Sequence, residues 1–415
     1  MLAATSTTVI PPQVDAARIQ AAFTESAATF GVVGMAWRVE TGGVSIDGRV
    51  GHTSSDEGAS SLSADQAWHW GSCTKALTAS VIGALVEERR IAWTTRVADH
   101  LLTLSKGSAL SSATVLELLH HRAGVVTDLD PEEELALAAE AAAVDASPTD
   151  QRRSFVAVLA AKPCSHPAGD NYGPYSNAGY VVLAALVEAV TGDAWERTVL
   201  RWAAGLGLTS LGFGGRPGGA VGRGEEGEPD KGDYAWHASS FSVHSTLADW
   251  ATFVRAHLHA AQARGDGTAG ASMRAASALA VGCSASGDND TATSLATPLG
   301  LKLSTVRILH TPASPAVDGE RFDGPEAPMG YACGWKSVWE DAEESAILRR
   351  RALTAPTGLL WHWGTNFRWN AGAFLDAPRD LLIVCGANCG SMMTRLAMKT
   401  AFDEVIIAAC GTPRK

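Results

Sequence analysis

The sequence has no excess of basic residues, because 33 lysines and arginines stand against 44 aspartates and glutamates. The formal net charge of -11 is spread along the whole chain. A nucleic-acid partner is therefore not expected, since phosphates require a basic face. No uncharged apolar run approaches the ~20 residues of a membrane-spanning helix, so no membrane span is predicted. Residues 1–13 lack the basic and apolar regions of a signal peptide, and only a leader removed earlier would alter that expectation.

Motifs for metals and cofactors are also missing. The sequence has no HExxH motif, no Walker lysine and no GxSxG elbow, and adjacent His120 and His121 cannot both point into one metal site from a helix. No metal and no cofactor is expected. The seven cysteines form no CxxC pair, and we interpret them as reduced thiols, which predicts a cytoplasmic protein. They are Cys73, Cys164, Cys283, Cys333, Cys385, Cys389 and Cys410.

Two stretches lack helical or strand periodicity and are predicted to be long surface loops. The first, Gly212 to Asp233, is rich in glycine and charge, and the second, Ser284 to Pro328, is rich in Ser, Thr, Pro and Asp. Gly222 to Gly227 satisfies GxGxxG, but no strand precedes it and two glutamates would face a phosphate. We interpret this segment as part of the first loop.

The two ends of the chain have similar patterns. Near the start, a helix is predicted over Val14–Phe30 and two strands over Val32–Glu40 and Val44–Val50. Since strands return near the end, one antiparallel sheet built from both ends, with a helical middle inserted, is predicted. The later strands are Gly330–Glu340, His362–Leu375 and Leu381–Ala387, and the predicted helices are Ser72–Ile91, Val115–His121, Pro131–Val144, Asp150–Ala161, Asn177–Thr191, Ala194–Ala204, Ser245–Ala263 and Ser391–Cys410.

The first candidate for chemistry is Ser72 with Lys75, at the start of an apolar helix. Residues three apart on a helix face the same way, so the hydroxyl and the amine can meet. Free N–H groups at a helix N-terminus can stabilise an oxyanion. A desolvated lysine is shifted toward its neutral, proton-accepting form. Taken alone, the pair also fits a helix-capping serine with a surface lysine.

Two further motifs carry polar groups at the ends of predicted elements. Tyr175 on the turn before a helix can present its phenol, and Asn177 offers a donor and an acceptor; a packed tyrosine with a capping asparagine is the alternative. In Trp361 to Thr365, the Thr365 N–H could donate to an oxyanion, Gly364 would let a substrate approach the backbone, and His362 would line the pocket. A packed strand histidine is the alternative there, and we interpret Trp68-His69-Trp70 as structural.

These three sites have the order, spacing and context of the S-x-x-K, Y-x-N and K/H-x-G motifs, and the sequence resembles the serine β-lactamase and penicillin-binding-protein superfamily. The resemblance runs from about residue 20 to the end of the chain. It implies an α+β, β-lactamase/transpeptidase-like fold with class C relatives. Other similar segments are Thr114–Gly124, Pro167–Gly169, Gly179–Tyr180, Val187–Gly192, Ser245–Thr246 with Asp249, and Gly334–Trp335.

The resemblance also implies a domain organisation. We expect one domain over residues 1–415, with an α/β part at about 10–90 and 330–415 and an all-helical part at about 90–330. The active site would lie between the two parts. The sequence leaves the oligomeric state open.

The resemblance implies that Ser72 attacks an ester or amide carbonyl while Lys75 and Tyr175 transfer its proton. Asn177, His362, Gly364 and Thr365 would bind the substrate. The sequence departs from the family where β-lactamases and transpeptidases carry a lysine, because His362 stands there, as in branches that resemble esterases and peptidases. Ser239-Ser240 replaces a usual Gly pair, and Arg122-Ala123 replaces a Thr-Ser pair.

The expected function is metal-free hydrolysis of a small ester or amide through an acyl-serine intermediate. The thirteen tryptophans suggest an apolar acyl group. An acyltransferase using the same acyl-enzyme is one alternative, and a non-catalytic binding or assembly module on this fold is another. Product analysis with added acceptors would distinguish acyl transfer from hydrolysis. Full biological effect of a Ser72→Ala protein would support the non-catalytic module.

Overall fold

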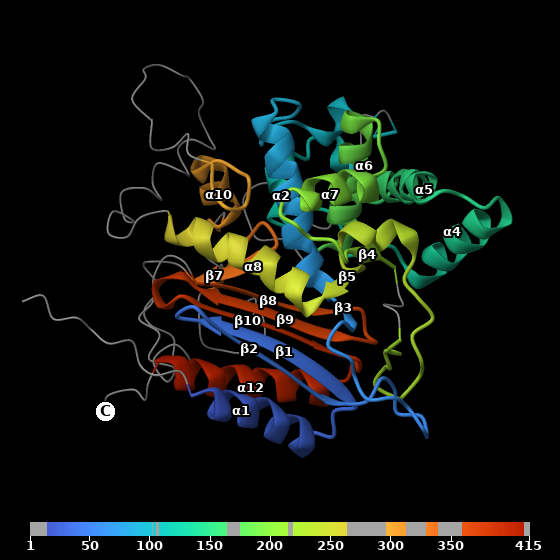
Figure 1. Ribbon diagram of the computed structural model, residues 1–415. Helices are drawn as coiled ribbons and strands as arrows, with labels where there is room; N and C mark the ends of the chain where they lie inside the picture. Colours follow the sequence, from blue (N-terminus) through green and yellow to red (C-terminus); the bar gives the residue numbers. More distant parts are fainter. Residues whose placement is uncertain are drawn as a thin grey trace, which may run out of the picture.

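A seven-stranded antiparallel sheet forms the centre of the computed structural model (Figure 1). The structure describes residues 15–101, 103–104, 108–163, 175–214, 219–263, 296–312, 329–338 and 359–410. The strand order is β2-β1-β10-β9-β8-β7-β6, so both ends of the chain contribute to one sheet, as predicted. The strands are β1 (Gly34–Thr41), β2 (Val44–Gly51), β6 (Met329–Ala332), β7 (Trp335–Val338), β8 (Leu359–Thr365), β9 (Asn370–Asp376) and β10 (Leu381–Ala387).

Helices cover both faces of this sheet. Helices α1 (Ala16–Thr29) and α12 (Met392–Cys410) pack together on one face, and α8 (Leu247–Gln262) packs on the other (Figure 1). Alternate residues of a strand point to opposite faces, and β10 illustrates this: Ile383 joins the core under α1 and α12, whereas Leu382 and Val384 join the core on the helical side. Burial on both faces explains why β10 is a continuous apolar run.

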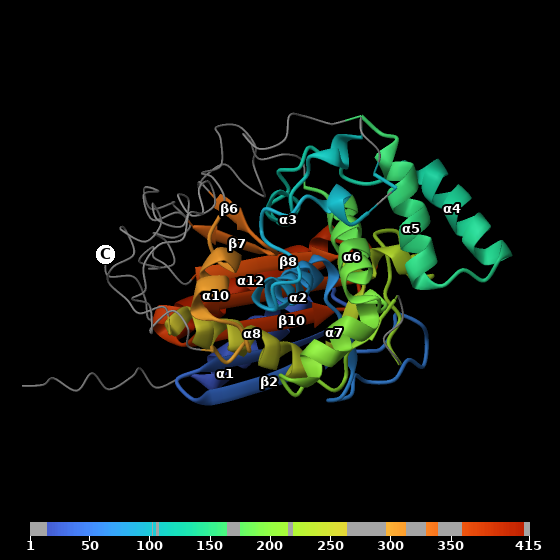
Figure 2. The same ribbon diagram turned by 90° about the horizontal axis from the view of Figure 1, so that it is seen from above.

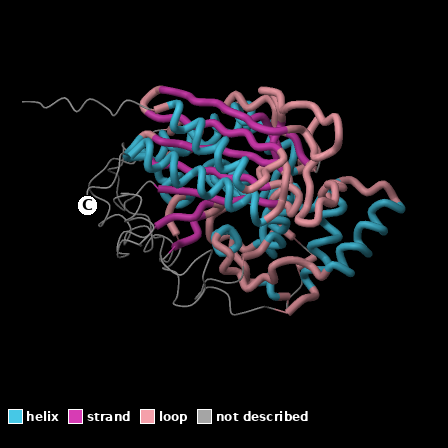
Figure 3. Tube along the Cα trace, turned by 90° about the horizontal axis from the view of Figure 1, so that it is seen from below, coloured by secondary structure: helices cyan, strands magenta, loops and turns pink. Residues whose placement is uncertain are grey.

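The middle of the chain is mostly helical but not entirely so. A second, three-stranded sheet has the order β3-β5-β4, with β3 at Ala67–His69, β4 at Gly212–Phe213 and β5 at Val243–Thr246. The prediction of an all-helical part over about residues 90–330 was wrong here, because β4 and β5 lie within it and are too short to show a period. The other helices lie on the α8 side of the main sheet (Figure 1). Seen from above, α2 and α10 lie over the strands and α4 and α5 extend beyond them (Figure 2), and Figure 3 shows the molecule from below. These helices are α2 (Thr74–Glu87), α3 (Val115–Leu119), α4 (Pro131–Ala143), α5 (Pro148–Ala160), α6 (Asn177–Thr191), α7 (Trp195–Ala204) and α10 (Leu303–Leu309).

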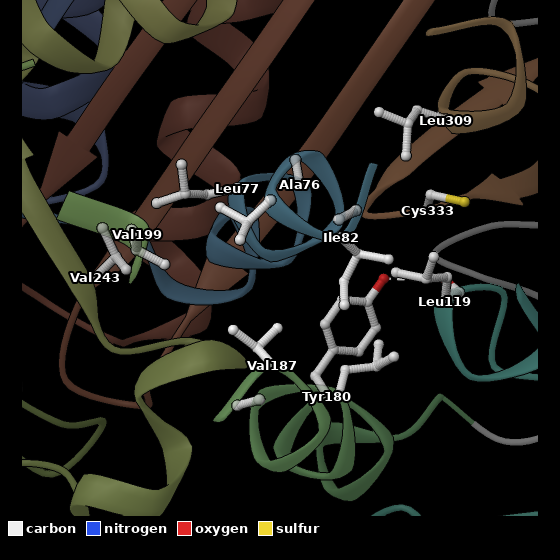
Figure 4. Close-up of a cluster of buried hydrophobic side chains, with 14 of the residues drawn as sticks. Ala76, Leu77, Ile82, Leu119, Tyr180, Val187, Val199, Val243, Leu309 and Cys333 are labelled. Atoms are coloured by element: carbon white, nitrogen blue, oxygen red, sulfur yellow. Dashed lines mark hydrogen bonds between the residues drawn. The ribbon is translucent and has the colours of Figure 1, made fainter. Parts of the chain in front are cut away.

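Helix α2 runs through the core between the sheet and the other helices. Its Leu77 and Ile82 are buried in the cluster shown in Figure 4. Tyr180 of α6 lies in the same cluster and donates a hydrogen bond from its hydroxyl to the Leu119 carbonyl at 3.0 Å. The segment before α2 is therefore attached to a rigid, fully packed element.

Several predicted boundaries differ from the structure. The stretch predicted as a helix from Ser245 begins as the end of β5, and the stretch His362–Leu375 is two strands joined by a turn. The predicted loop Ser284–Pro328 contains α10, while its residues 284–295 and 313–328 lie outside the described residues. Gly222–Gly227 is a turn, as predicted, with the Gly224 N–H donating to the Glu228 carbonyl.

Most of the described tryptophans lie in the hydrophobic core, so their number does not by itself indicate an apolar acyl group, which stays a prediction. Tryptophan side chains fill the cores on both faces of the main sheet and beside the small sheet. Large aromatic side chains contribute to the core by burying area. The fully buried ones among the described residues are Trp37, Trp68, Trp70, Trp195, Trp236, Trp250, Trp335 and Trp369.

No single described helix is long and apolar enough to cross a membrane. Helices α6 and α7 are long and apolar enough only when taken together, and this pair is bent by 80°.

A buried ion triad joins three helices of the middle region. The guanidinium of Arg152 in α5 is fully buried, and it donates to Glu188 of α6 and, at 2.8 Å, to Glu196 of α7. Removing one partner from such a group leaves buried charge without compensation. The triad therefore predicts a strong dependence of stability on Arg152.

Arg152→Ala is expected to lower the free energy of unfolding by about 3–5 kcal/mol, because two carboxylates would lose their only buried cation. Urea unfolding of both proteins would measure the change. The matched control is Arg153→Ala, since Arg153 pairs with Asp150 on the surface and such pairs contribute ~1 kcal/mol at most. Equal stability of the two variants would contradict the prediction.

Candidate active site

Ser72 lies on a short 3-10 turn, η1 (Gly71–Cys73), that leads directly into α2. Gly71 has a φ of +51°, a left-handed conformation that favours glycine. No side-chain capping hydrogen bond exists at the start of η1 or of α2. Ser72 is therefore not a helix-capping serine, and the turn leaves its hydroxyl available for other contacts.

Lys75 is fully buried and is not a surface lysine. Its Nζ lies 2.8 Å from Asn177 Oδ1, 2.9 Å from the Ser240 carbonyl oxygen and 3.3 Å from Ser72 Oγ. A neutral amine has two N–H donors and one lone pair. Asn177 Oδ1 and the Ser240 carbonyl oxygen can only accept, so they take the two N–H donors of a neutral Lys75. The lone pair of the amine then faces the Ser72 hydroxyl.

Burial lowers the pKa of Lys75 well below its usual range, and the Asp128 carboxylate is the largest opposing influence. Removing an ammonium from water disfavours its charged form. The shift therefore supplies the neutral amine that the geometry requires. Asp128 also contacts Asn177, whose Nδ2 donates to Asp128 Oδ2 at 3.3 Å.

Tyr175 lies beside this pair. The Lys75 Nζ is 4.6 Å from the centre of the Tyr175 ring. Burial raises the pKa of the Tyr175 phenol, while hydrogen bonding with the Ser72 and Tyr331 side chains acts in the opposite direction. The phenol therefore stays protonated at neutral pH. Chain segments separated by a hundred residues bring the hydroxyl, the amine and the phenol together, as the motif order predicted.

The turn of Ser72 packs tightly against β8. A Cβ atom on Gly71 would lie 2.3 Å from the Thr365 backbone nitrogen, and one on Gly364 would lie 2.8 Å from the Ser72 nitrogen and 2.2 Å from the Trp70 carbonyl oxygen. Glycine at both positions allows this approach. The backbones that carry the Ser72 and Thr365 N–H groups are therefore neighbours, which is the arrangement that an oxyanion site needs.

Gly364→Ala is expected to lower kcat/KM for an ester substrate by about 10²-fold, because the added methyl forces the two N–H groups apart and one well-placed oxyanion donor contributes about that factor. Steady-state assays would measure it. Gly179→Ala is the control, since a Cβ there meets nothing closer than 3.4 Å and alanine favours the helix. Similar rates for wild type and Gly364→Ala would contradict the prediction.

His362 lies within β8 and is buried. Its Nδ1 lies 2.7 Å from the Trp363 carbonyl oxygen and donates to it, so Nε2 carries the lone pair. Among the described residues Nε2 has no hydrogen-bond partner. Burial, followed by the nearby charge of Lys336, lowers the pKa of His362 well below its usual range. A neutral imidazole facing the rings of Tyr175 and Tyr331 supplies an acceptor, not a cation.

Sequence analysis missed three contributors to this site. Asp128 and Tyr331 belong to no motif that was singled out, and Ser240 was noted only as a departure from the family. The Ser240 contribution is a backbone carbonyl, which side-chain patterns do not reveal. Only the contact of Asp128 with Asn177 distinguishes it from other loop carboxylates.

One group among the described residues has the composition of a cation site. Asp128, Glu134 and His237 place one ligand atom each within 4.8 Å of one another. His237 Nε2 and Glu134 Oε1 lie 2.8 Å apart, so a hydrogen bond already accounts for these two side chains. We assign no ion to this group.

Comparison with known proteins identifies the family. The family profile described as Beta-lactamase matches residues 19–371 of this chain. The chain belongs to the Beta-lactamase family. This match covers most of the chain, and the resemblance inferred from the three motifs is confirmed.

Several solved structures have the same fold. A β-lactamase/D-alanine carboxypeptidase from Pseudomonas syringae has a TM-score of 0.66 at 17% identity, covering 94% of this chain and 98% of that one. A class C β-lactamase from Rhodobacter sphaeroides has a TM-score of 0.65 at 16% identity, covering 95% and 99%. SurE has a TM-score of 0.66 at 20% identity, covering 96% and 77%. A search of curated proteins found no match.

These comparisons confirm the β-lactamase/transpeptidase-like, α+β fold. They also place the chain among serine hydrolases related to β-lactamases and penicillin-binding proteins.

Proposed function

We propose that this Beta-lactamase family protein hydrolyses a small ester or amide through a covalent acyl group on Ser72, as a carboxylesterase or amidase. The observation that carries the proposal is the hydrogen bonding of the Lys75 amine. Both N–H donors of its neutral amine meet oxygens that cannot donate, and the remaining lone pair faces Ser72 Oγ at 3.3 Å. An adjacent base of this kind activates a serine nucleophile.

The first half-reaction follows from this arrangement. Lys75 accepts the Ser72 proton as Oγ bonds to the carbonyl carbon, and the N–H groups of Ser72 and Thr365 stabilise the oxyanion. The tetrahedral intermediate then collapses with loss of an alcohol or amine. That leaving group takes a proton from the Tyr175 phenol, which is restored from the Lys75 ammonium. Asn177 holds the amine in place throughout.

The second half-reaction uses water. Lys75 is again neutral and accepts a proton from water, whose oxygen attacks the acyl carbon. Ser72 leaves with that proton, and the free acid is released. Every step uses side chains of this chain, so the proposed reaction requires no metal and no cofactor.

His362 sets the expected substrate class. A buried neutral imidazole does not offer the positive charge that would bind a substrate carboxylate, so we propose that β-lactams are poorer substrates than neutral esters. D-Aminoacyl compounds are tested as a separate class, because similar solved structures include a D-alanine carboxypeptidase from Burkholderia cenocepacia and SurE with D-Leu.

The proposal is tested by covalent labelling and a substrate panel. A fluorophosphonate probe is expected to label Ser72, with the modified peptide located by mass spectrometry. Short-chain p-nitrophenyl esters, D-aminoacyl amides and a chromogenic cephalosporin would be assayed in parallel, and added alcohol acceptors would separate hydrolysis from acyl transfer. Folded protein that is neither labelled nor active on any of these compounds would refute the proposed function.

A further inference from the structure

A buried aspartate, Asp233, lies behind the turn that carries Ser72 and connects two side chains. His69 Nε2 lies 2.8 Å from its Oδ2, and Asn366 Nδ2 donates to its Oδ1 at 3.0 Å. The imidazole is fully buried, and the carboxylate is only 8% exposed. Both carboxylate oxygens are therefore engaged inside the protein.

The hydrogen bonds determine the tautomer of His69. The Gly71 backbone N–H donates to His69 Nδ1 at 3.0 Å, so Nδ1 must carry the lone pair. The proton of a neutral imidazole then lies on Nε2, where it is donated to Asp233. The aspartate thus selects the tautomer that can accept from Gly71.

The two hydrogen-bond partners of Asp233, His69 and Asn366, contact or belong to the backbone segments that carry the two proposed oxyanion donors. Gly71, bonded through His69, immediately precedes Ser72, and Asn366 immediately follows Thr365. Asn366 Oδ1 also accepts from the Trp369 backbone N–H at 3.0 Å, which closes the turn after β8. One carboxylate therefore links both backbone segments that meet at Gly71 and Thr365.

The surrounding contacts keep the aspartate in place. Trp369 stacks on His69, with ring centres 6.5 Å apart and an interplanar angle of 18°, and its Nε1 donates to Asp230 at 2.8 Å. Asp230 and Asp233 belong to the segment predicted as a surface loop, yet both side chains are buried. Although burial acts to raise it, the pKa of Asp233 is lowered overall by His69 and its other hydrogen-bond donors, so the carboxylate stays charged.

We propose that Asp233 is a positioning residue that, through His69 and Asn366, holds the Ser72 and Thr365 N–H groups at the spacing that binds the oxyanion. The proposal rests on the proposed acyl-serine function. It assigns a catalytic purpose to His69, which is otherwise a packed aromatic residue between two tryptophans. A carboxylate is required because it offers an acceptor oxygen to each of these two donors, whereas the isosteric amide of asparagine offers only one.

Asp233→Asn tests this requirement. The asparagine amide has one acceptor oxygen and one NH2 group in place of the two carboxylate oxygens. If its oxygen accepts from His69, its NH2 group faces the Nδ2 donor of Asn366. If its oxygen accepts from Asn366, His69 must switch tautomer and lose the Gly71 hydrogen bond. The expected result is a fall in kcat of about 10²-fold with KM nearly unchanged. The inhibition constant of phenylboronic acid, whose tetrahedral adduct occupies the oxyanion site, is expected to rise by a similar factor.

A paired exchange supplies the control. In Asp233→Asn combined with Asn366→Asp, the new asparagine accepts from His69 Nε2 and donates to the new aspartate, which still accepts from the Trp369 N–H. The hydrogen bonds of His69 Nε2 and of the Trp369 N–H, and the one between residues 233 and 366, are then all made with the amide and the carboxylate exchanged, so the double variant is expected to recover kcat and boronate affinity. Nitrogen-15 chemical shifts of His69 would report the Nε2–H tautomer in wild type and in the double variant.

The outcomes are distinct. Full kcat and boronate affinity in folded Asp233→Asn, or a folded double variant with no recovery, would overturn the proposal. Failure of the wild-type protein to react with esters and with the fluorophosphonate probe would instead refute the proposed function, while the nitrogen shifts would still report whether Asp233 selects the tautomer.

Discussion

Ser72→Ala is expected to lower kcat/KM for a p-nitrophenyl ester by about 10⁴-fold or more and to abolish fluorophosphonate labelling. Among the described residues, Ser72 Oγ is the hydroxyl that hydrogen-bonds with the Lys75 amine, and loss of a serine nucleophile reduces rates by factors of this size in other serine hydrolases. The residual rate would come from the oxyanion donors and substrate binding. Stopped assays at high protein concentration would measure it.

Ser80→Ala is the matched control for this variant. Ser80 lies two turns further along α2, where its hydroxyl donates to the Ala76 carbonyl at 2.8 Å. Its removal is expected to cost ~1 kcal/mol of stability and to leave activity and labelling intact. If Ser72→Ala kept its activity or its labelling, another residue would have to be the nucleophile.

Lys75→Met is expected to lower kcat/KM by about 10³-fold, because methionine matches the length of the side chain but offers no lone pair for the Ser72 proton. Wild-type kcat/KM should rise with pH as the Lys75 ammonium loses its proton. Since burial lowers the pKa of Lys75, this rise should occur well below the range of ordinary lysines. The Lys75→Met variant should lack this rise of kcat/KM with pH.

Stability should depend on pH through the same group. Between the lowered folded-state pKa of Lys75 and the ordinary value of 10.5, the unfolded chain binds a proton that the folded chain does not. The free energy of unfolding contributed by this group therefore rises with pH across that window and is constant below and above it. Lys75→Met should lose this contribution, which urea unfolding at several pH values would measure.

Lys302→Met is the control for both measurements, because Lys302 is an exposed residue before α10. It should keep the activity and both pH dependences of the wild type. A Lys75→Met protein with the wild-type pH profile would show that another group removes the Ser72 proton.

Long, regular elements were predictable because their periodicity is local. Asn177–Thr191 was predicted with the bounds that α6 has, and Leu381–Ala387 with those of β10. Short elements were not, since β4 has two residues and no period. The turn between β8 and β9 was also missed, because both flanking strands are apolar and the sequence shows no strong turn signal there.

The candidate site was predictable to a similar degree. The identities of Ser72, Lys75 and Tyr175 followed from motif spacing and order, but Asp128 and Asp233 did not. A carboxylate in a glycine-rich, charged loop resembles a solvated residue, and only the fold shows that the side chain of Asp233 is buried against His69.

The sequence alone therefore predicted the long elements and the residues of the three motifs, since each depends on patterns over a few neighbouring positions. The similar patterns of the two chain ends also predicted that both join one sheet. Only the tertiary structure decided the protonation states of Lys75 and His362 and the tautomer of His69. These properties depend on desolvation and on hydrogen-bond partners more than a hundred residues away, and no local pattern encodes which distant atom will face a buried nitrogen.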